Sequence, residues 1–211
     1  MPGITRLIDV RAALAALGLA GLAALAVAIV THLPAPAPSV PATHATTGLS
    51  RLQTLPLQAQ SVISSTIGGD SRAYAARHTA SGWQLSGGGV RADLRAGTPT
   101  LAAAGGTLSM SLADAPAPTS VTAHGNRVTL TRPGIREWYS AGPLGVEQGF
   151  TLSRRPAGSE LTLNISGGLR PQVASSGITF LGAHGLAVLR YGGLTAVDAR
   201  GHRLASSLAL R

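Results

Sequence analysis

The sequence has no cysteine and no lysine, and it has few aromatic residues: two Trp, three Tyr and two Phe in 211 residues. The absence of cysteine excludes disulfide bonds, thiolate metal sites and cysteine nucleophiles. Acidic residues are also scarce, since eight Asp and Glu stand against 17 arginines and give a net charge of +9. These arginines are dispersed, without a long run of like charge or a basic stripe interleaved with aromatics, so we do not expect nucleic acid as a partner.

Motifs with well-defined chemistry are missing as well. The sequence contains no GxSxG nucleophile elbow, no phosphate-binding loop, no GxGxxG fingerprint and no HExxH. The histidines stand at positions 32, 44, 78, 124, 184 and 202, so no two of them have the i, i+4 spacing of a helical metal site. The sequence therefore predicts no metal, no cofactor and a protein that is not an enzyme.

A long apolar run lies near the N-terminus. Residues Ala12 to Val30 carry no charge and would form a helix of about 28 Å, close to the roughly 30 Å of a bilayer's hydrocarbon core. Arg6 and Arg11 precede the run and the next arginine is Arg51, so the positive-inside rule places the N-terminus in the cytoplasm. We expect a transmembrane anchor or the hydrophobic region of a cleaved signal peptide, and either places the remainder of the chain outside.

The composition divides the chain into four segments. Residues 1–11 form the cytoplasmic end, 12–30 the membrane or signal segment, 31–56 a linker rich in Pro, Ala and Thr, and 57–211 a folded domain. Alternating prolines make such a linker a semi-stiff, solvated spacer, which would hold the domain away from a membrane surface. The domain is long enough to bury one core without metal or disulfide bonds.

Beyond the linker the hydrophobic pattern changes to a period of two. A short helix is predicted first, over Leu57–Ile67, because Pro56 precedes it and Gly68-Gly69 follow it. The remainder has the alternation of half-buried strands, with turn signals at Gly125-Asn126 and at Asp198–Gly201. The clearest alternation is found in residues 90–94, 108–112, 127–131 and 161–165. We predict an all-β domain: an antiparallel β-sandwich or open barrel-like fold of about nine or ten short strands.

Residues 136–152 form a distinctive stretch that we predict to be a structural centre. Trp138 and Phe150 are separated by an even number of residues and would meet on one face of a hairpin that turns at Pro143–Gly145. The glycines in this stretch would supply positive φ or close backbone approach. The residues of this structural motif are Trp138, Gly142, Pro143, Gly145, Glu147, Gly149 and Phe150.

Two functional hypotheses compete with a purely structural role. Trp83, Trp138 and Tyr139 border glycine-rich turns and are candidates for stacking on a glycan or polyanion of the cell envelope. Glu137 and Glu147 flank the turn and would form a carboxylate pair on adjacent strands, as in a glycan hydrolase.

The same stretch, together with three later segments, resembles the N-terminal β domain of large exported bacterial proteins. In those proteins FG-GAP, kelch or other propeller repeats, or immunoglobulin-like or cadherin-like repeats, follow the domain. The matching segments are 136–152 (REWYSAGPLGVEQGFTL), 155–158 (RPAG), 189–194 (LRYGGL) and 198–201 (DARG). The resemblance covers roughly Leu57 to Arg211 and brings no catalytic residue with it.

The resemblance implies a non-catalytic, extracytoplasmic structural or interaction module at the N-terminus of a cell-surface or secreted repeat protein. Its partners would be the membrane, through the N-terminal helix, and envelope glycans or downstream repeat domains. In the proteins of this family further strands and then repeats follow the position of Leu210, so we expect this chain to be a fragment of a longer protein, a truncated gene product or a short variant.

Overall fold

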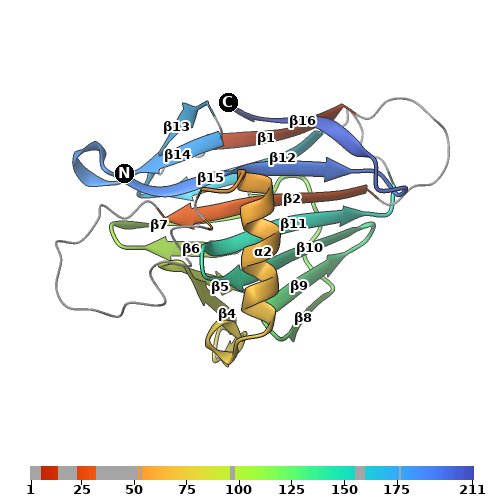
Figure 1. The fold of residues 1–211 in the computed structure, drawn as a ribbon, viewed down its shortest axis with the longest axis horizontal. Coiled ribbons are helices and arrows are strands. Elements are labelled where there is room, and N and C mark those ends of the chain that lie inside the picture. The colour runs from red at the N-terminus through yellow and green to blue at the C-terminus, as the bar shows by residue number, and fades with distance from the viewer. Residues whose placement is uncertain are drawn as a thin grey trace.

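The computed structural model describes residues 6–13, 23–31, 52, 54–95, 98–154, 160–175 and 177–211. Within these ranges every strand pair is antiparallel, and the one long helix is α2 (Leu57–Gly69). The prediction of an all-β fold with a short helix at its start is confirmed (Figure 1).

The strands follow one another along a curled sheet whose two parts form packed layers. The first layer contains, in spatial order, β3 (Arg77–Thr79), β4 (Gly82–Gly87), β5 (Val90–Leu94), β6 (Thr100–Ala103), β7 (Gly106–Leu112), β12 (Glu160–Gly167) and β1 (Arg6–Ala13). The second contains β8 (Ser120–His124), β9 (Arg127–Arg132), β10 (Ile135–Gly142), β11 (Gly145–Leu152), β2 (Ala23–Thr31), β15 (Ala187–Val197), β14 (Gly177–Leu181) and β13 (Arg170–Ala174). β16 (Arg203–Leu210) pairs with both β1 and β15 and so joins the layers.

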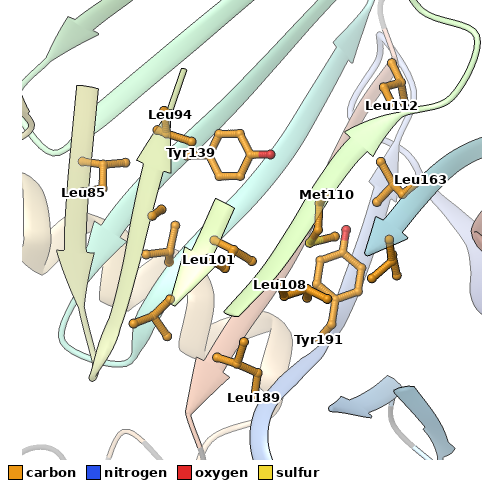
Figure 2. Packing of buried hydrophobic residues seen from close by; sticks show 14 of the residues in the cluster. Leu85, Leu94, Leu101, Leu108, Met110, Leu112, Tyr139, Leu163, Leu189 and Tyr191 are labelled. Atoms are coloured by element: carbon orange, nitrogen blue, oxygen red, sulfur yellow. The ribbon is translucent and has the colours of Figure 1, made fainter. Parts of the chain in front are cut away.

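The core lies between the layers and is built from the residues that alternate along the strands. In β5, β7 and β12 the predicted apolar positions are buried, and β9 buries Val128 and Leu130 completely. Figure 2 shows Tyr139 and Tyr191 among the leucines of this cluster. Since β4 contacts β10 and β11, the two layers approach each other here, and Gly87 lies against the backbone of Gly142.

The structure has more strands than the nine or ten predicted. Three of the additional ones, Arg77–Thr79, Thr100–Ala103 and Arg170–Ala174, are short, and the last contains Pro171. Their residues do not alternate between apolar and polar as those of the five-residue strand at 90–94 do, so the period of two did not identify them.

The N-terminal region differs from the prediction of one helix over Ala12–Val30. Arg6–Ala13 and Ala23–Thr31 are strands, the second inserted between β11 and β15, while residues 14–22 and the linker at 32–51 lie outside the described residues. Periodicity alone does not separate a buried strand from a helix within an apolar run. Among the described helices, none has the length and apolar character needed to cross a membrane.

Helix α2 covers the outer face of the second layer, where it runs across β2, β11 and β10 (Figure 1). The side of the helix that faces the sheet is made of small and polar residues: Gln60, Ser64 and Gly68 are buried at i, i+4 and i+8. Small residues let the helix backbone come close to the sheet, and a Cβ on Gly68 would overlap the carbonyl oxygen of Ala141.

Candidate functional site

The candidate site is the hairpin of β10 and β11, whose turn consists of the two residues Pro143-Leu144. Its register places Trp138 opposite Gly149 and Glu137 opposite Phe150. Residues opposite one another in an antiparallel pair share a face. Trp138 and Phe150 therefore lie on opposite faces, and the prediction that they meet was wrong: it assumed a three-residue turn, and one residue fewer exchanges the faces of one strand relative to the other.

The inner face of this hairpin carries a buried polar cluster, which we call the Glu137 cluster. It consists of Arg132, Glu137, Tyr139, Gln148 and Tyr191. Glu137 is its centre: Oε2 accepts a hydrogen bond from Arg132 Nη1 at 2.6 Å, and Oε1 accepts from the Tyr139 hydroxyl at 2.6 Å and from Gln148 Nε2 at 2.9 Å. The side chains of Arg132 and Glu137 are only 3% and 1% exposed, so the two charges neutralise each other with little screening by solvent.

The cluster continues across the second layer. The Tyr191 hydroxyl, on β15, donates to Gln148 Oε1 at 2.9 Å, although β2 separates their two strands. Gln148 Nε2 also lies 2.8 Å from the Tyr139 hydroxyl, and Arg132 Nε donates to the carbonyl oxygen of Pro116 at 3.0 Å. The buried polar groups thus satisfy one another, which is the condition under which a buried network stabilises a fold.

Burial sets the ionisation of the two tyrosines. It raises the pKa of Tyr139 well above its ordinary value, and the neighbouring Glu137 carboxylate raises it further. The pKa of Tyr191 is raised by the same two causes, in the same order. Both hydroxyls therefore stay protonated near neutral pH and act as hydrogen-bond donors in the cluster.

The outer face holds a stack of Arg127, Trp138 and Gly149. A Cβ on Gly149 would overlap the six-membered ring of Trp138, so the half-buried indole lies directly on this backbone. Arg127 Cζ lies 4.0 Å from the ring centroid, and its Nε donates to Ser140 Oγ at 2.9 Å. Burial lowers the pKa of Arg127, and the nearby Glu147 carboxylate opposes this shift. The indole is thus held between a backbone and a guanidinium.

The turn of the hairpin is wedged between α2 and the β4–β5 turn. The amide of Leu144 donates to Ser64 Oγ at 3.0 Å, and a Cβ on Gly142 would overlap the Ser64 carbonyl. On the other side, a Cβ on Gly87 or Gly88 would overlap the backbone of residues 142–145. The predicted need for glycine by close approach is confirmed at positions 142 and 149, and Gly145 has a φ of 142°.

The three aromatic residues predicted to bind a ligand lie in different environments. Tyr139 is fully buried between the layers. Trp83 packs against the core from β4 and meets His78 edge to face, with ring centroids 4.9 Å apart. Trp138 is covered by Arg127 on the outer face. These positions give no shared stacking surface, because Trp138 and Tyr139 are consecutive residues of one strand and point to opposite faces.

The two glutamates predicted as a carboxylate pair are also divided by the sheet. Glu147 is opposite Ser140 on the outer face, whereas Glu137 is opposite Phe150 on the inner face. A glycosidase needs both carboxyl groups in one cleft, where they flank the same glycosidic bond. The proposed pairing was wrong for the same reason as the aromatic pairing, the length of the turn.

The histidines and acidic residues that the structure describes do not gather into a metal centre. In the part of the chain that the structure describes, no three His, Asp or Glu side chains are close enough to hold a metal ion. His124 and His184 are exposed near turns, and His202 pairs with Asp198 at 3.1 Å. His32 and His44 lie outside the described residues.

Comparison with protein families, with characterised proteins and with solved structures finds no match to this chain. The resemblance to exported repeat proteins stays a prediction.

Sequence reasoning missed three members of the Glu137 cluster, Arg132, Gln148 and Tyr191. A signal for two of them was present. Arg132 continues the buried phase of Val128 and Leu130, and Gln148 lies in phase with Val146 and Phe150. A polar residue in the buried phase of two nearby strands indicates a shared internal network.

Proposed function

We propose that the chain is a non-catalytic, extracytoplasmic β module that supports or presents a larger cell-surface or secreted protein. The observation that carries this proposal is the closure of the Glu137 cluster. Its carboxylate, amide, guanidinium and phenol groups bind one another inside the core. A catalytic acid or base must instead reach a substrate atom, directly or through one water.

The packing of the hairpin supports the same proposal. The stretch 136–152 is the most distinctive of the sequence, and its residues are used in contacts within the fold: Gly142 under α2, Gly149 under Trp138, and Glu137 inside the core. Such a hairpin fixes the position of the helix and of both layers, which is the property that a rigid spacer or cap requires.

The extracytoplasmic location is supported by the sequence, through the uncharged run Ala12–Val30 and the arginines that precede it. In the fold, part of this run is the strand β2. A segment cannot lie in a bilayer and in the sheet of the same molecule, so export would take both β1 and β2 out of the sheet, either into the membrane or by cleavage.

The proposal is tested in bacterial cells that produce the full chain with a C-terminal epitope tag. We expect added protease to remove the tag from intact cells, whereas a cytoplasmic control protein stays protected. A tag that is digested only after lysis would overturn the extracytoplasmic location.

The non-catalytic part is tested with a variant that removes the buried ion pair, Arg132→Met with Glu137→Gln. Replacement of a buried pair by uncharged residues is often close to neutral for stability. We expect the variant to keep the amount and location of the wild-type protein. A hydrolytic activity on cell-wall polysaccharide that is present in wild type and lost in this folded variant would contradict the proposal.

A further inference from the structure

The outer face of β8 to β11 forms a polar surface beside α2. Figure 1 shows these strands extending to one side of the helix, which crosses the layer. The register of the strand pairs places the outward side chains in rows that run across the strands. One row contains Thr122, Thr129 and Trp138, the next contains Ser120, Thr131, Arg136 and Thr151, and Arg127 lies opposite Ser140 in a third. The residues of the first two rows and Arg127 are exposed or partly exposed, and we call them the arginine face.

The arginine face carries positive charge without the carboxylates that balance it elsewhere. On the outer face of the first layer, Arg91 pairs with Asp93 at 3.3 Å. Among the residues that the structure describes, neither Arg127 nor Arg136 forms a salt bridge. Glu147, two strands from Arg127 in the same row, is only 7% exposed. The face therefore presents to solvent a positive charge that is complementary to an anionic partner.

Arg127 is held in one position before any ligand binds. Its guanidinium lies over the Trp138 ring, and its Nε donates to Ser140 Oγ. Its two Nη groups make no hydrogen bond to a described residue, and such a fork matches the two oxygens of a carboxylate. Burial also lowers the pKa of Arg127, so an anion would restore stabilisation that water supplies only in part. A fixed guanidinium loses little further freedom when an anion binds.

Helix α2 limits the shape of a partner that can reach this face. The helix lies on the backbone of β10, and a helix with its side chains is about 10–12 Å across, so it stands above the strands beside it. A flat partner such as a membrane would meet the helix first. A narrow linear chain can lie on the strands beside the helix, where the threonine hydroxyls both donate and accept hydrogen bonds.

We propose that the arginine face binds a linear acidic polysaccharide, with one carboxylate on Arg127 and a second on Arg136. The two arginines are on adjacent strands, and Arg136 precedes Ser140, the register partner of Arg127, by four residues, or about 13 Å along the strand. A polymer with a carboxylate on each sugar can reach both, while its hydroxyls bind Thr129 and Thr131 between them. The inference goes beyond the proposed function, because it names a ligand and uses no residue of β1 or β2.

The test measures binding of the purified full chain to polygalacturonate by calorimetry at low salt. The control probe is the fully methyl-esterified polymer, which has the same sugar backbone without the charge. We expect the acidic polymer to bind about tenfold more tightly than the ester, and the difference to shrink as salt is added. No binding of the acidic polymer, or equal binding of both, would overturn the proposal.

Two pairs of variants locate the site. Arg136→Gln removes a charge from the arginine face, and Arg77→Gln removes the same charge from β3 in the first layer; both side chains are exposed. We expect the first to weaken binding about fivefold and the second to leave it unchanged. Thr122→Glu adds a carboxylate to the face and Thr107→Glu adds one to the outer face of β7, and only the first should weaken binding. Equal effects within the pairs would mean that net charge and not this face governs binding, which would overturn the site.

Single-stranded DNA with the same number of charges is the third probe. We expect it to bind more weakly than polygalacturonate, because the arginine face offers hydroxyls for sugars and no aromatic ring free on both sides for bases to stack on. Tighter binding of the DNA, reduced by Arg136→Gln, would assign the face to nucleic acid and overturn the polysaccharide as its ligand. Thermal melts of the variants show whether each keeps the fold, so a loss of binding is read only from folded protein.

Discussion

At the scale of single residues, the contact between Gly149 and Trp138 limits what the outer face tolerates. A valine at position 149 would place its Cβ inside the indole. Overpacking of this kind costs about 1–3 kcal/mol, and each kcal/mol lowers Tm by about 2–4 °C in a chain of this size. We expect that loss for Gly149→Val in thermal melts. In a Trp138→Ala background the same substitution should cost little, and an additive loss in the double variant would contradict the contact.

A second residue-scale prediction concerns the ion pair of the Glu137 cluster. Arg132→Met leaves the carboxylate of Glu137 buried without its cation. Removal of one partner of a buried pair costs about 3–5 kcal/mol. We expect this loss in urea unfolding, and we expect Arg132→Met with Glu137→Gln to recover most of it. Equal stability of the single and the double variant would show that the buried Glu137 carboxylate does not destabilise the fold when Arg132 is absent.

The buried tyrosines should make the stability of the fold depend on pH in the alkaline range. Because burial raises the pKa of Tyr139 and Tyr191, the folded state keeps protons that the unfolded state releases above about pH 10. Their stabilisation is complete below pH 10 and is lost as the pH rises above it, by up to about 1.4 kcal/mol per pH unit for each tyrosine.

The measurement follows tyrosinate absorbance and near-ultraviolet circular dichroism together as the pH rises from 9 to 12. We expect Tyr139 and Tyr191 to ionise only when the chain unfolds, and Tyr191→Phe to make the decline of stability with pH less steep. Ionisation of all three tyrosines before any loss of the dichroism signal would show that these hydroxyls are accessible in the folded protein.

At the scale of elements, the contact between α2 and the hairpin depends on a small residue at position 68. A Cβ on Gly68 would overlap the Ala141 carbonyl, whereas a Cβ on Gly69 would find its nearest neighbour, Asn126 Oδ1, at an ordinary 3.7 Å. The two substitutions to alanine have the same intrinsic effect on a helix, a gain of up to about 1 kcal/mol.

We therefore expect Gly68→Ala to lift α2 from the sheet and to speed amide exchange in the helix at least tenfold. Gly69→Ala is the matched control and should leave the exchange unchanged or slower. Faster exchange in both variants, or in neither, would contradict the packing of α2 on the backbone of β10.

Two hairpins could be predicted from the sequence, because turn residues separate two alternating segments in each. The hairpin of β8 and β9 was predicted because Gly125-Asn126 separates two alternating segments, and Gly125 indeed has a positive φ of 55°. The hairpin at Asp198–Gly201 was predicted in the same way and is confirmed by the pairing of Ala196 with Leu204. The faces of β10 and β11 could not be predicted, because they depend on whether Gly145 belongs to the turn or to the strand.

At the scale of the whole molecule, the central position of β2 in the sheet leads us to predict how a proline in this strand changes the Tm of the purified protein. Ala26 pairs with Gly149 on one side and with Thr195 on the other. A proline there removes a ladder hydrogen bond in the middle of a sheet and leaves a buried acceptor unsatisfied, at about 1–3 kcal/mol. We expect Ala26→Pro to lower Tm and Ala42→Pro, in the linker, to leave it unchanged. An equal Tm for both variants would mean that Ala23–Thr31 is outside the sheet in the purified protein.

The class of the fold and a large part of its core follow from the amino-acid pattern alone. Alternation along β5, β7, β9 and β12 identifies the buried residues, because neighbouring side chains of a strand point to opposite faces whatever the strand pairs with. The absence of cysteine likewise excludes disulfide bonds in any fold.

The facing of side chains across strand pairs and the place of the apolar N-terminal run depend on tertiary contacts, which no local pattern contains. The Glu137 cluster joins Arg132, Gln148 and Tyr191 from three strands, so its members become neighbours only after the register of each strand pair is set. The run Ala12–Val30 satisfies the hydropathy of a membrane segment, and its second half also has the alternation of large and small residues that suits a buried strand. The choice between them depends on the slot formed by β11 and β15, since a strand is stabilised by hydrogen bonds to its neighbours, whereas a helix makes its own.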